Sequence, residues 1–293
     1  MSGAESPRGS PIDYWQQLPY QTRERVYNWL LNLLLAGGLV LLMFPIYWMI
    51  ATSILPSNEL FSIPTPLLPT EPTVSTYAAV FDSDIMLWYR NTVLLSAGVV
   101  TLSTVAATFA GYGLARLDIP YKKTFARVIL FGYMFPPILL SIPMYILWRQ
   151  VGLLNSLLGV TIAQTATTLP FAIWLMWQFF QTVPYSLEES ARMSGCTSFQ
   201  AFYDIALPLA KPGMIAVAIF SFAIAWGSFT IPSILLSDSS KYVLTLGLYS
   251  FTQQESVLWG QIMAASTLMV LPTFFFVYYL QKYILRGFQT SRL

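Results

Sequence analysis

The sequence predicts an all-α integral membrane protein with six transmembrane helices. Of its 293 residues, 56% are hydrophobic and only 10% are charged, whereas a soluble domain has about 25% charged residues. A chain this apolar cannot cover itself with a hydrated surface, so lipid must be its solvent. Six apolar runs are each long enough for the roughly 20 residues that a membrane helix needs, and they lie near residues 28–50, 91–114, 126–148, 157–180, 212–236 and 262–283.

Each of these runs is expected to be helical, because the hydrocarbon core offers no water to satisfy backbone N–H and C=O groups. A Pro-rich loop between the first two runs should be extended and exposed. Some prolines lie inside the runs, where we expect kinks rather than breaks because neighbouring helices can satisfy the freed backbone groups. These prolines are Pro136, Pro137, Pro143 and Pro170.

The basic side chains predict the orientation in the membrane. With the N-terminus in the cytoplasm, only three of the 15 Lys and Arg residues fall in outer segments, namely Arg90, Arg149 and Lys241. Cytoplasmic loops of membrane proteins are rich in Lys and Arg, so we expect both termini inside the cell (N-in/C-in). The chain then divides into a cytoplasmic arm at 1–25, a transmembrane domain at 26–288 and a cytoplasmic tail at 289–293.

Composition excludes several functional classes. The chain has no His and one cysteine, Cys196, so it lacks both the commonest general base and any Cys/His metal-ligand spacing. It has no phosphate-binding P-loop, and a net charge of +2 is too small to indicate nucleic-acid binding. Glu188 and Glu189 are adjacent, so on a helix they point about 100° apart, unlike a catalytic pair. We therefore assign no catalytic residue, no metal ligand and no bound cofactor to this chain.

The interiors of the six runs carry essentially no charge. Proton- and ion-coupled transporters usually keep ionisable side chains within the bilayer. Two classes fit their absence: a passive channel or facilitator, and a transporter whose energy comes from another subunit.

The loop at 181–211 differs from the others because two short helices can be predicted in it. Ser186 and Glu189 have the spacing of a capping box for the first helix. Gly195 should end that helix in a left-handed conformation, and Thr197 with Gln200 should cap the second helix.

One face of the second predicted helix is aromatic. Phe199, Phe202 and Ala206 share it, at spacings of three and four residues. One hypothesis is an amphipathic loop that lies on the membrane. The other is a ridge that fills a groove on a partner protein, with Phe199 and Phe202 as anchors and Glu188 and Glu189 as cap and docking residues.

The same loop carries a family motif. Glu189-Ser190-Ala191, followed by three residues, Gly195, nine residues and Ile205-x-Leu207-Pro208, resembles the EAA signature of ABC importer permeases. Other blocks resemble the MalG-like group of carbohydrate-uptake permeases: Phe44-Pro45-Ile46-Tyr47-Trp48-Met49, Trp226-Gly227-Ser228-Phe229 and Trp259-Gly260-Gln261-Ile262-Met263-Ala264.

The resemblance implies a type I ABC importer permease fold in the cell membrane of a prokaryote, and an ATP-driven importer of a sugar or oligosaccharide. It implies four kinds of partner: a MalF-like second permease, a dimer of ATPase subunits that hold ATP and Mg, an extracytoplasmic solute-binding protein and the sugar itself. The coupling loop would dock on the ATPase through residues of the motif and its aromatic face: Glu188, Glu189, Ser190, Ala191, Gly195, Phe199, Phe202, Ile205, Leu207 and Pro208. A permease for another solute, such as a polyol, glycerol phosphate or peptide, remains an alternative.

Candidate substrate contacts are polar or aromatic residues on the fourth and fifth runs, because a neutral sugar is held by hydrogen bonds and stacked rings. They are Gln164, Thr165, Thr168, Trp226, Ser228 and Thr230. Packing between membrane helices is an alternative role for each of them.

Overall fold

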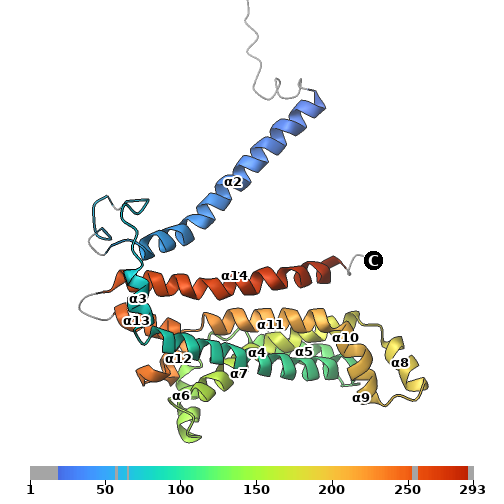
Figure 1. Ribbon diagram of the computed structural model, residues 1–293. Coiled ribbons are helices and arrows are strands. Elements are labelled where there is room, and N and C mark those ends of the chain that lie inside the picture. The colour runs from blue at the N-terminus through green and yellow to red at the C-terminus, as the bar shows by residue number, and fades with distance from the viewer. Residues whose placement is uncertain (1–18, 57–58, 65, 253–256, 290–293) are drawn as a thin grey trace, which may run out of the picture.

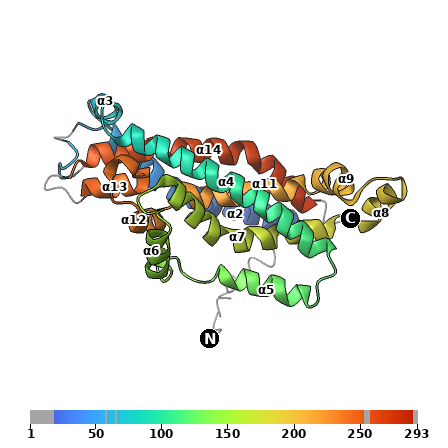
Figure 2. The same cartoon turned by 90° about the horizontal axis from the view of Figure 1, so that it is seen from below.

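The computed structural model describes residues 19–56, 59–64, 66–252 and 257–289, and within those ranges it contains helices but no strand. The centre is a bundle of three long helices, α4 (Ile85–Arg116), α7 (Leu157–Thr182) and α11 (Lys211–Trp226), which lie side by side (Figures 1 and 2). One hydrophobic core between them contains Ala107, Ala172, Met176, Phe180 and Val217.

The contact between α4 and α7 is very close at Gly111. A Cβ atom placed there would lie 2.7 Å from the Cβ of Met176 and 2.8 Å from the backbone nitrogen of Trp177. Both obstructing atoms are fixed to the α7 backbone, so a side chain could not be accommodated without separating the helices. The small residue therefore sets the distance between the two central helices, as small residues do in membrane bundles.

The two ends of the bundle have different elements. At one end, here called the α3 end, lie α3 (Ser75–Phe81), α12 (Thr230–Leu235), η2 (Ser239–Lys241) and α13 (Leu244–Thr252). The opposite end, here called the α8 end, carries α8 (Tyr185–Met193), α9 (Ser198–Ala201), η1 (Phe202–Ala206) and α10 (Leu207–Leu209) (Figure 1).

Two long helices lie outside the three-helix centre. Helix α14 (Trp259–Gln289) packs against α11 and against α2 (Tyr20–Ser53). Helix α2 then departs from the bundle (Figure 1), and only Ala51, Thr52 and Ser53 at its end are buried. It begins at Tyr20, so the last residues of the arm predicted at 1–25 are helical; residues 1–18 lie outside the described part of the chain, and the boundary of the arm stays a prediction.

The third predicted run, 126–148, is not one helix. It is divided into α5 (Lys122–Gly132) and α6 (Ser141–Gln150), with turns between them. The expectation of a kink was wrong here because two consecutive prolines, Pro136 and Pro137, remove two backbone donors and clash with the preceding turn. By contrast, Pro170 lies inside a continuous α7, as expected.

The fifth predicted run, 212–236, is also interrupted. Helix α11 ends at Trp226, and α12 begins only at Thr230. Over the described residues, four helices are long and apolar enough to cross a membrane, or five if the bent pair Ser198–Leu209 and Lys211–Trp226 counts as one span. The chain is therefore an all-helical membrane protein. That it has six transmembrane helices stays a prediction.

The packing at Gly111 leads to a stability prediction. Gly111→Ala should destabilise the purified chain by about 1–3 kcal/mol, because overpacking strains a close helix contact. Gly113→Ala is the matched control, since its Cβ would meet only the Cδ1 of Leu117 at an ordinary 3.6 Å, and alanine favours the helix. The unfolding temperatures of both variants can be measured in detergent. Equal midpoints would contradict the conclusion that Gly111 sets the distance between α4 and α7.

Candidate functional site

The first helix of the loop, α8, begins at Tyr185 directly after Pro184, and no side chain caps its first turn. The predicted capping box of Ser186 and Glu189 is therefore wrong. Both residues already lie inside the helix, because the extended backbone of Pro184 starts it earlier than the box requires.

The end of α8 confirms the left-handed conformation predicted for Gly195. Its φ is +98°, in the region where glycine is favoured over residues with a side chain. The Gly195 N–H donates to the Arg192 carbonyl at 3.0 Å and the Cys196 N–H donates to the Ala191 carbonyl at 3.1 Å. These two bonds form a Schellman motif, which fixes the direction in which the chain leaves the helix.

The second helix is capped as predicted. The Thr197 hydroxyl accepts from the Gln200 N–H at 3.2 Å, and the Gln200 side chain accepts from the Thr197 N–H at 2.7 Å. The helix then widens into the π-helical turn η1, in which the Leu207 N–H donates to the Phe202 carbonyl. Pro208 follows in α10 and has no N–H to continue the ladder.

A buried ion pair attaches α8 to the end of α4. Arg116 Nε lies 2.7 Å from Glu188 Oε1, and Glu188 is only 2% exposed. The Tyr112 hydroxyl donates to Glu188 Oε2 at 2.8 Å, and Arg116 Nη2 donates to the Val183 carbonyl at 2.9 Å. Both carboxylate oxygens are thus satisfied, which a buried charge requires.

The carboxylate of Glu188 faces α4 and is buried, whereas the neighbouring Glu189 is exposed. Burial therefore favours Glu189 over Glu188 as a surface residue, and the docking role of both stays a prediction. The aromatic face is divided in the same way, since Phe199 is 66% exposed and Phe202 is buried at 5% against Tyr112 and Phe109. Phe202 is therefore an internal anchor of the loop and not a surface one.

Tyr185 is a further organising residue that the motif did not indicate. Its ring lies under two guanidinium groups, with the Cζ of Arg192 at 5.1 Å and that of Arg116 at 5.4 Å from the ring centroid. The hydrogen bond to its hydroxyl raises the pKa of Arg192. The first turn of α8 is therefore held to α4 by the cation–π contact with Arg116 as well as by the ion pair, while the contact with Arg192 lies within α8.

The remaining motif residues lie on the same knob of α8 to α10. Ser190 and Ala191 are on α8, and Ile205, Leu207 and Pro208 continue from η1 into α10. The knob is bound to the bundle, because Phe202, Ala206 and Ala210 belong to the core that contains Met176 and Phe180.

The candidate substrate contacts are only partly brought together. Gln164 on α7 and Ser228 after α11 meet, since the Ser228 hydroxyl donates to Gln164 Oε1 at 2.6 Å. The hydroxyls of Thr165 and Thr168 instead donate to carbonyls of their own helix, at 2.7 and 2.6 Å. Their polar groups are therefore satisfied internally.

The other two candidates lie beside this pair. Trp226 is buried, and its indole N–H donates to the Met269 carbonyl of α14 at 3.0 Å. Thr230 begins α12 and is half-buried. The interruption at 227–229 places Gln164 and Ser228 next to non-helical backbone, the kind of backbone that membrane proteins tolerate only within protein or beside water.

Comparison with known proteins decides the family. Residues 103–290 match the family model described as "Binding-protein-dependent transport system inner membrane component". The chain belongs to this family. Members of the family are membrane subunits of transport systems, so the chain is a permease subunit and not an enzyme.

Individual relatives agree with this assignment. The chain is 31% identical over 260 residues to the inner membrane ABC transporter permease protein YcjP of Escherichia coli, covering 86% of this permease and 91% of that protein. It is 32% identical to the diacetylchitobiose uptake system permease protein DasC of Streptomyces coelicolor, over 84% and 90% of the two chains. A chain of a bacterial ABC transporter that imports alginate has the same fold, with a TM-score of 0.77, 22% identity and coverage of 95% and 99%.

The ion pair leads to a second prediction. Glu188→Ala should lower the free energy of unfolding by about 3–5 kcal/mol, because it leaves the charge of Arg116 buried without a partner. Glu189→Ala, one residue away and exposed, is the control and should change stability by less than about 0.5 kcal/mol. Thermal unfolding and protease cleavage within 181–211 report both effects, and identical behaviour of the two variants would refute the tether.

Proposed function

We propose that this permease forms one half of the translocation pathway of an ATP-driven importer for a sugar or oligosaccharide. Relatives named for diacetylchitobiose and trehalose transport support a carbohydrate substrate. A structural neighbour is an importer of alginate, which is also a carbohydrate. A non-sugar solute, such as a polyol, glycerol phosphate or peptide, is the alternative for the substrate alone.

The observation that carries the proposal is the rigid attachment of the α8 knob to the bundle. A coupling element must move with the spans, because a loose loop would absorb the motion of its partner. Here the ion pair with Arg116 and the buried Phe202 attach the knob on one side, while Glu189 and Phe199 remain exposed on the other. A passive facilitator, the second alternative, would need no such element.

The proposed partners follow from this division of the surface. The exposed part of the knob would dock on a dimer of ATPase subunits, which hold ATP and Mg and supply the energy. A second, MalF-like permease would form the other half of the pathway. An extracytoplasmic binding protein would deliver the sugar at the α3 end; a related transporter has been solved with an alginate pentasaccharide-bound periplasmic protein.

We further propose six crossings with both termini in the cytoplasm, the pair α5 and α6 forming an interrupted third crossing. The charge distribution supports this orientation, since Arg116, Lys122, Arg192 and Lys211 belong to the segments that meet at the α8 end. Along the pathway, Gln164 and Ser228 are the candidates for sugar contact, because they lie together beside the interrupted helix.

Gly195 provides a test of coupling. In a complete transporter in liposomes, Gly195→Val should largely abolish the stimulation of ATP hydrolysis by the loaded binding protein, because a side chain at this φ costs about 1–2 kcal/mol and misdirects α9. Gly152→Val is the matched control, with φ of +70° and open space around it but a place outside the knob. Equal loss in both variants would mean that general strain, and not coupling, is responsible.

The only cysteine of the chain gives a test of orientation. Cys196 is partly exposed in the knob, so a membrane-impermeant maleimide should label it in inverted membrane vesicles and not in intact cells. A Cys196→Ser, Ser240→Cys variant moves the thiol to the α3 end and should reverse this pattern. Labelling of Cys196 from outside the cell would overturn the proposed topology.

A further inference from the structure

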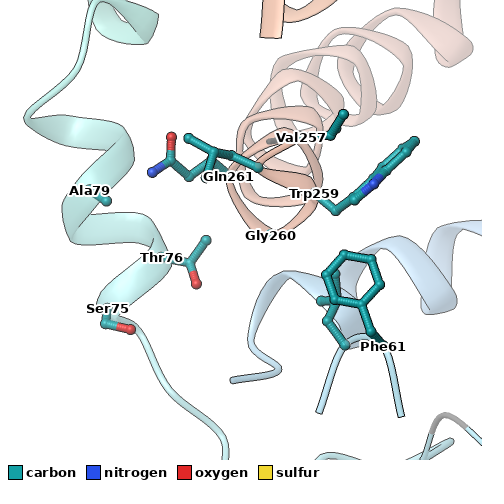
Figure 3. Close-up of a pocket in the computed structure, with 10 residues that line it drawn as sticks. Phe61, Ser75, Thr76, Ala79, Val257, Trp259, Gly260 and Gln261 are labelled. Carbon is teal, nitrogen blue, oxygen red and sulfur yellow. The ribbon is translucent and has the colours of Figure 1, made fainter. Parts of the chain in front are cut away.

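A cavity of about 290 Å³ opens at the α3 end of the molecule. It lies between the start of the loop after α2, helix α3 and the first turn of α14 (Figure 3). Its walls are formed by Leu60, Phe61, Ser75, Thr76, Ala79, Val257, Leu258, Trp259, Gly260 and Gln261. This volume is near the lower limit of small-molecule sites, so it suits a single ring rather than a long chain.

One wall of the cavity is aromatic and is not covered by the rest of the described chain. Phe61 is 68% exposed and Trp259 is 40% exposed. Figure 3 shows their rings on the same side of the α14 start. Large aromatic surfaces that remain exposed within a hollow indicate a binding site more strongly than single exposed apolar residues do.

The opposite wall is polar, and its side chains have free hydrogen-bonding groups. Figure 3 shows the Gln261 amide reaching from α14 toward α3, with Thr76 on α3 nearby and Gly260 between the two walls. Among the described residues, neither the Thr76 hydroxyl nor the Gln261 amide has a hydrogen-bond partner, so both are available to a ligand. An amide and a hydroxyl can together donate to and accept from the hydroxyl groups of a ligand.

The residues that form the walls of the cavity carry no charge. None of the ten residues that form its walls is acidic or basic. A carboxylated ligand would find no cation to compensate the loss of its hydration. A neutral ligand with an apolar face and polar edges fits both walls, and this is the chemistry of a neutral pyranose ring.

A second cavity of about 180 Å³ adjoins the first one. The two share Leu60, Phe61 and Trp259, while Trp48 and Met263 belong only to the second. The aromatic wall is therefore accessible from two sides. A ligand of two rings could place one ring in each space.

We infer that this pair of cavities is a subsite for a neutral disaccharide at the α3 end, with Phe61 and Trp259 as stacking surfaces and Thr76 and Gln261 as hydrogen-bonding groups. The inference rests on the proposed function, which makes a sugar the substrate. It assigns substrate contacts to residues other than Gln164 and Ser228, and it restricts the substrate class to uncharged glycans.

Binding to the full-length chain in lipid nanodiscs tests the inference. Saturation-transfer difference NMR with N,N′-diacetylchitobiose and trehalose should show binding by at least one of them, and an acidic alginate oligosaccharide should bind at least about tenfold more weakly. Trp259→Ala and Gln261→Leu should each weaken the binding of the neutral sugar about tenfold. Two matched controls, Trp29→Ala on the exposed part of α2 and Gln150→Leu at the end of α6, should leave it unchanged.

Gln261→Leu preserves side-chain size and should leave the fold intact. Its effect on binding can therefore be interpreted even if Trp259→Ala destabilises the chain. Absence of binding by either sugar, or equal affinity in all four variants, overturns the subsite. Sugar uptake by the complete transporter in liposomes separates this result from the broader proposal. If ATP-driven uptake persists while binding to the chain is absent, the subsite alone is wrong; if uptake is also absent, the proposed transport function fails.

Discussion

The buried ion pair between Arg116 and Glu188 is the contact on which the arrangement of the α8 end depends. It joins the last turn of a central helix to the first turn of α8, and Tyr112 and the Val183 carbonyl complete its hydrogen bonds. A buried charge pair contributes little net stability compared with apolar packing, but loss of one partner is costly. Its main consequence here is geometric, because it holds the first turn of α8 against the last turn of α4.

The Schellman motif at Gly195 and the buried ring of Phe202 continue this control along the knob. The ion pair positions α8, the left-handed residue sets the turn, and Phe202 returns the chain to the core beside Tyr112. Three different interactions thus fix three consecutive segments. The exposed residues between them, such as Glu189 and Phe199, are presented by a rigid frame, which is a requirement for an accurate contact with another protein.

Much of this architecture could be predicted from sequence. Hydropathy located most of the long helices, and local rules gave the Thr197–Gln200 box and the conformation of Gly195, because these depend on neighbouring residues only. The breaks at 133–140 and 227–229 could not be predicted with the same rules. A proline in an apolar run is compatible with a kink or a break, as Pro170 and Pro136 show, and the packing around it decides between them.

In the candidate site, too, local sequence rules could not predict the contacts that depend on the fold. Glu188 and Glu189 are indistinguishable in the sequence, yet one is buried and the other exposed, because Arg116 lies 72 residues earlier and only the fold brings it close. Thr165 and Thr168 were selected for their hydroxyls, and these groups bond to the backbone one turn earlier. The available signal was that Arg116 lies at the end of a span with no acidic residue three or four positions away in the sequence, which indicates a partner elsewhere in the fold.

The sequence of helix α2 is constrained by the bilayer more than by packing within the chain, unlike the sequences of α4 and α7. Its most apolar stretch has no buried residue, so no side chain there must fit a neighbour within this chain. Its 34 residues extend about 51 Å, longer than the roughly 30 Å of a hydrocarbon core. The helix must therefore tilt or project beyond the bilayer. Bilayer thickness rather than internal packing constrains its length, so substitutions that preserve its hydrophobicity should be tolerated within this chain far better than in α4 or α7.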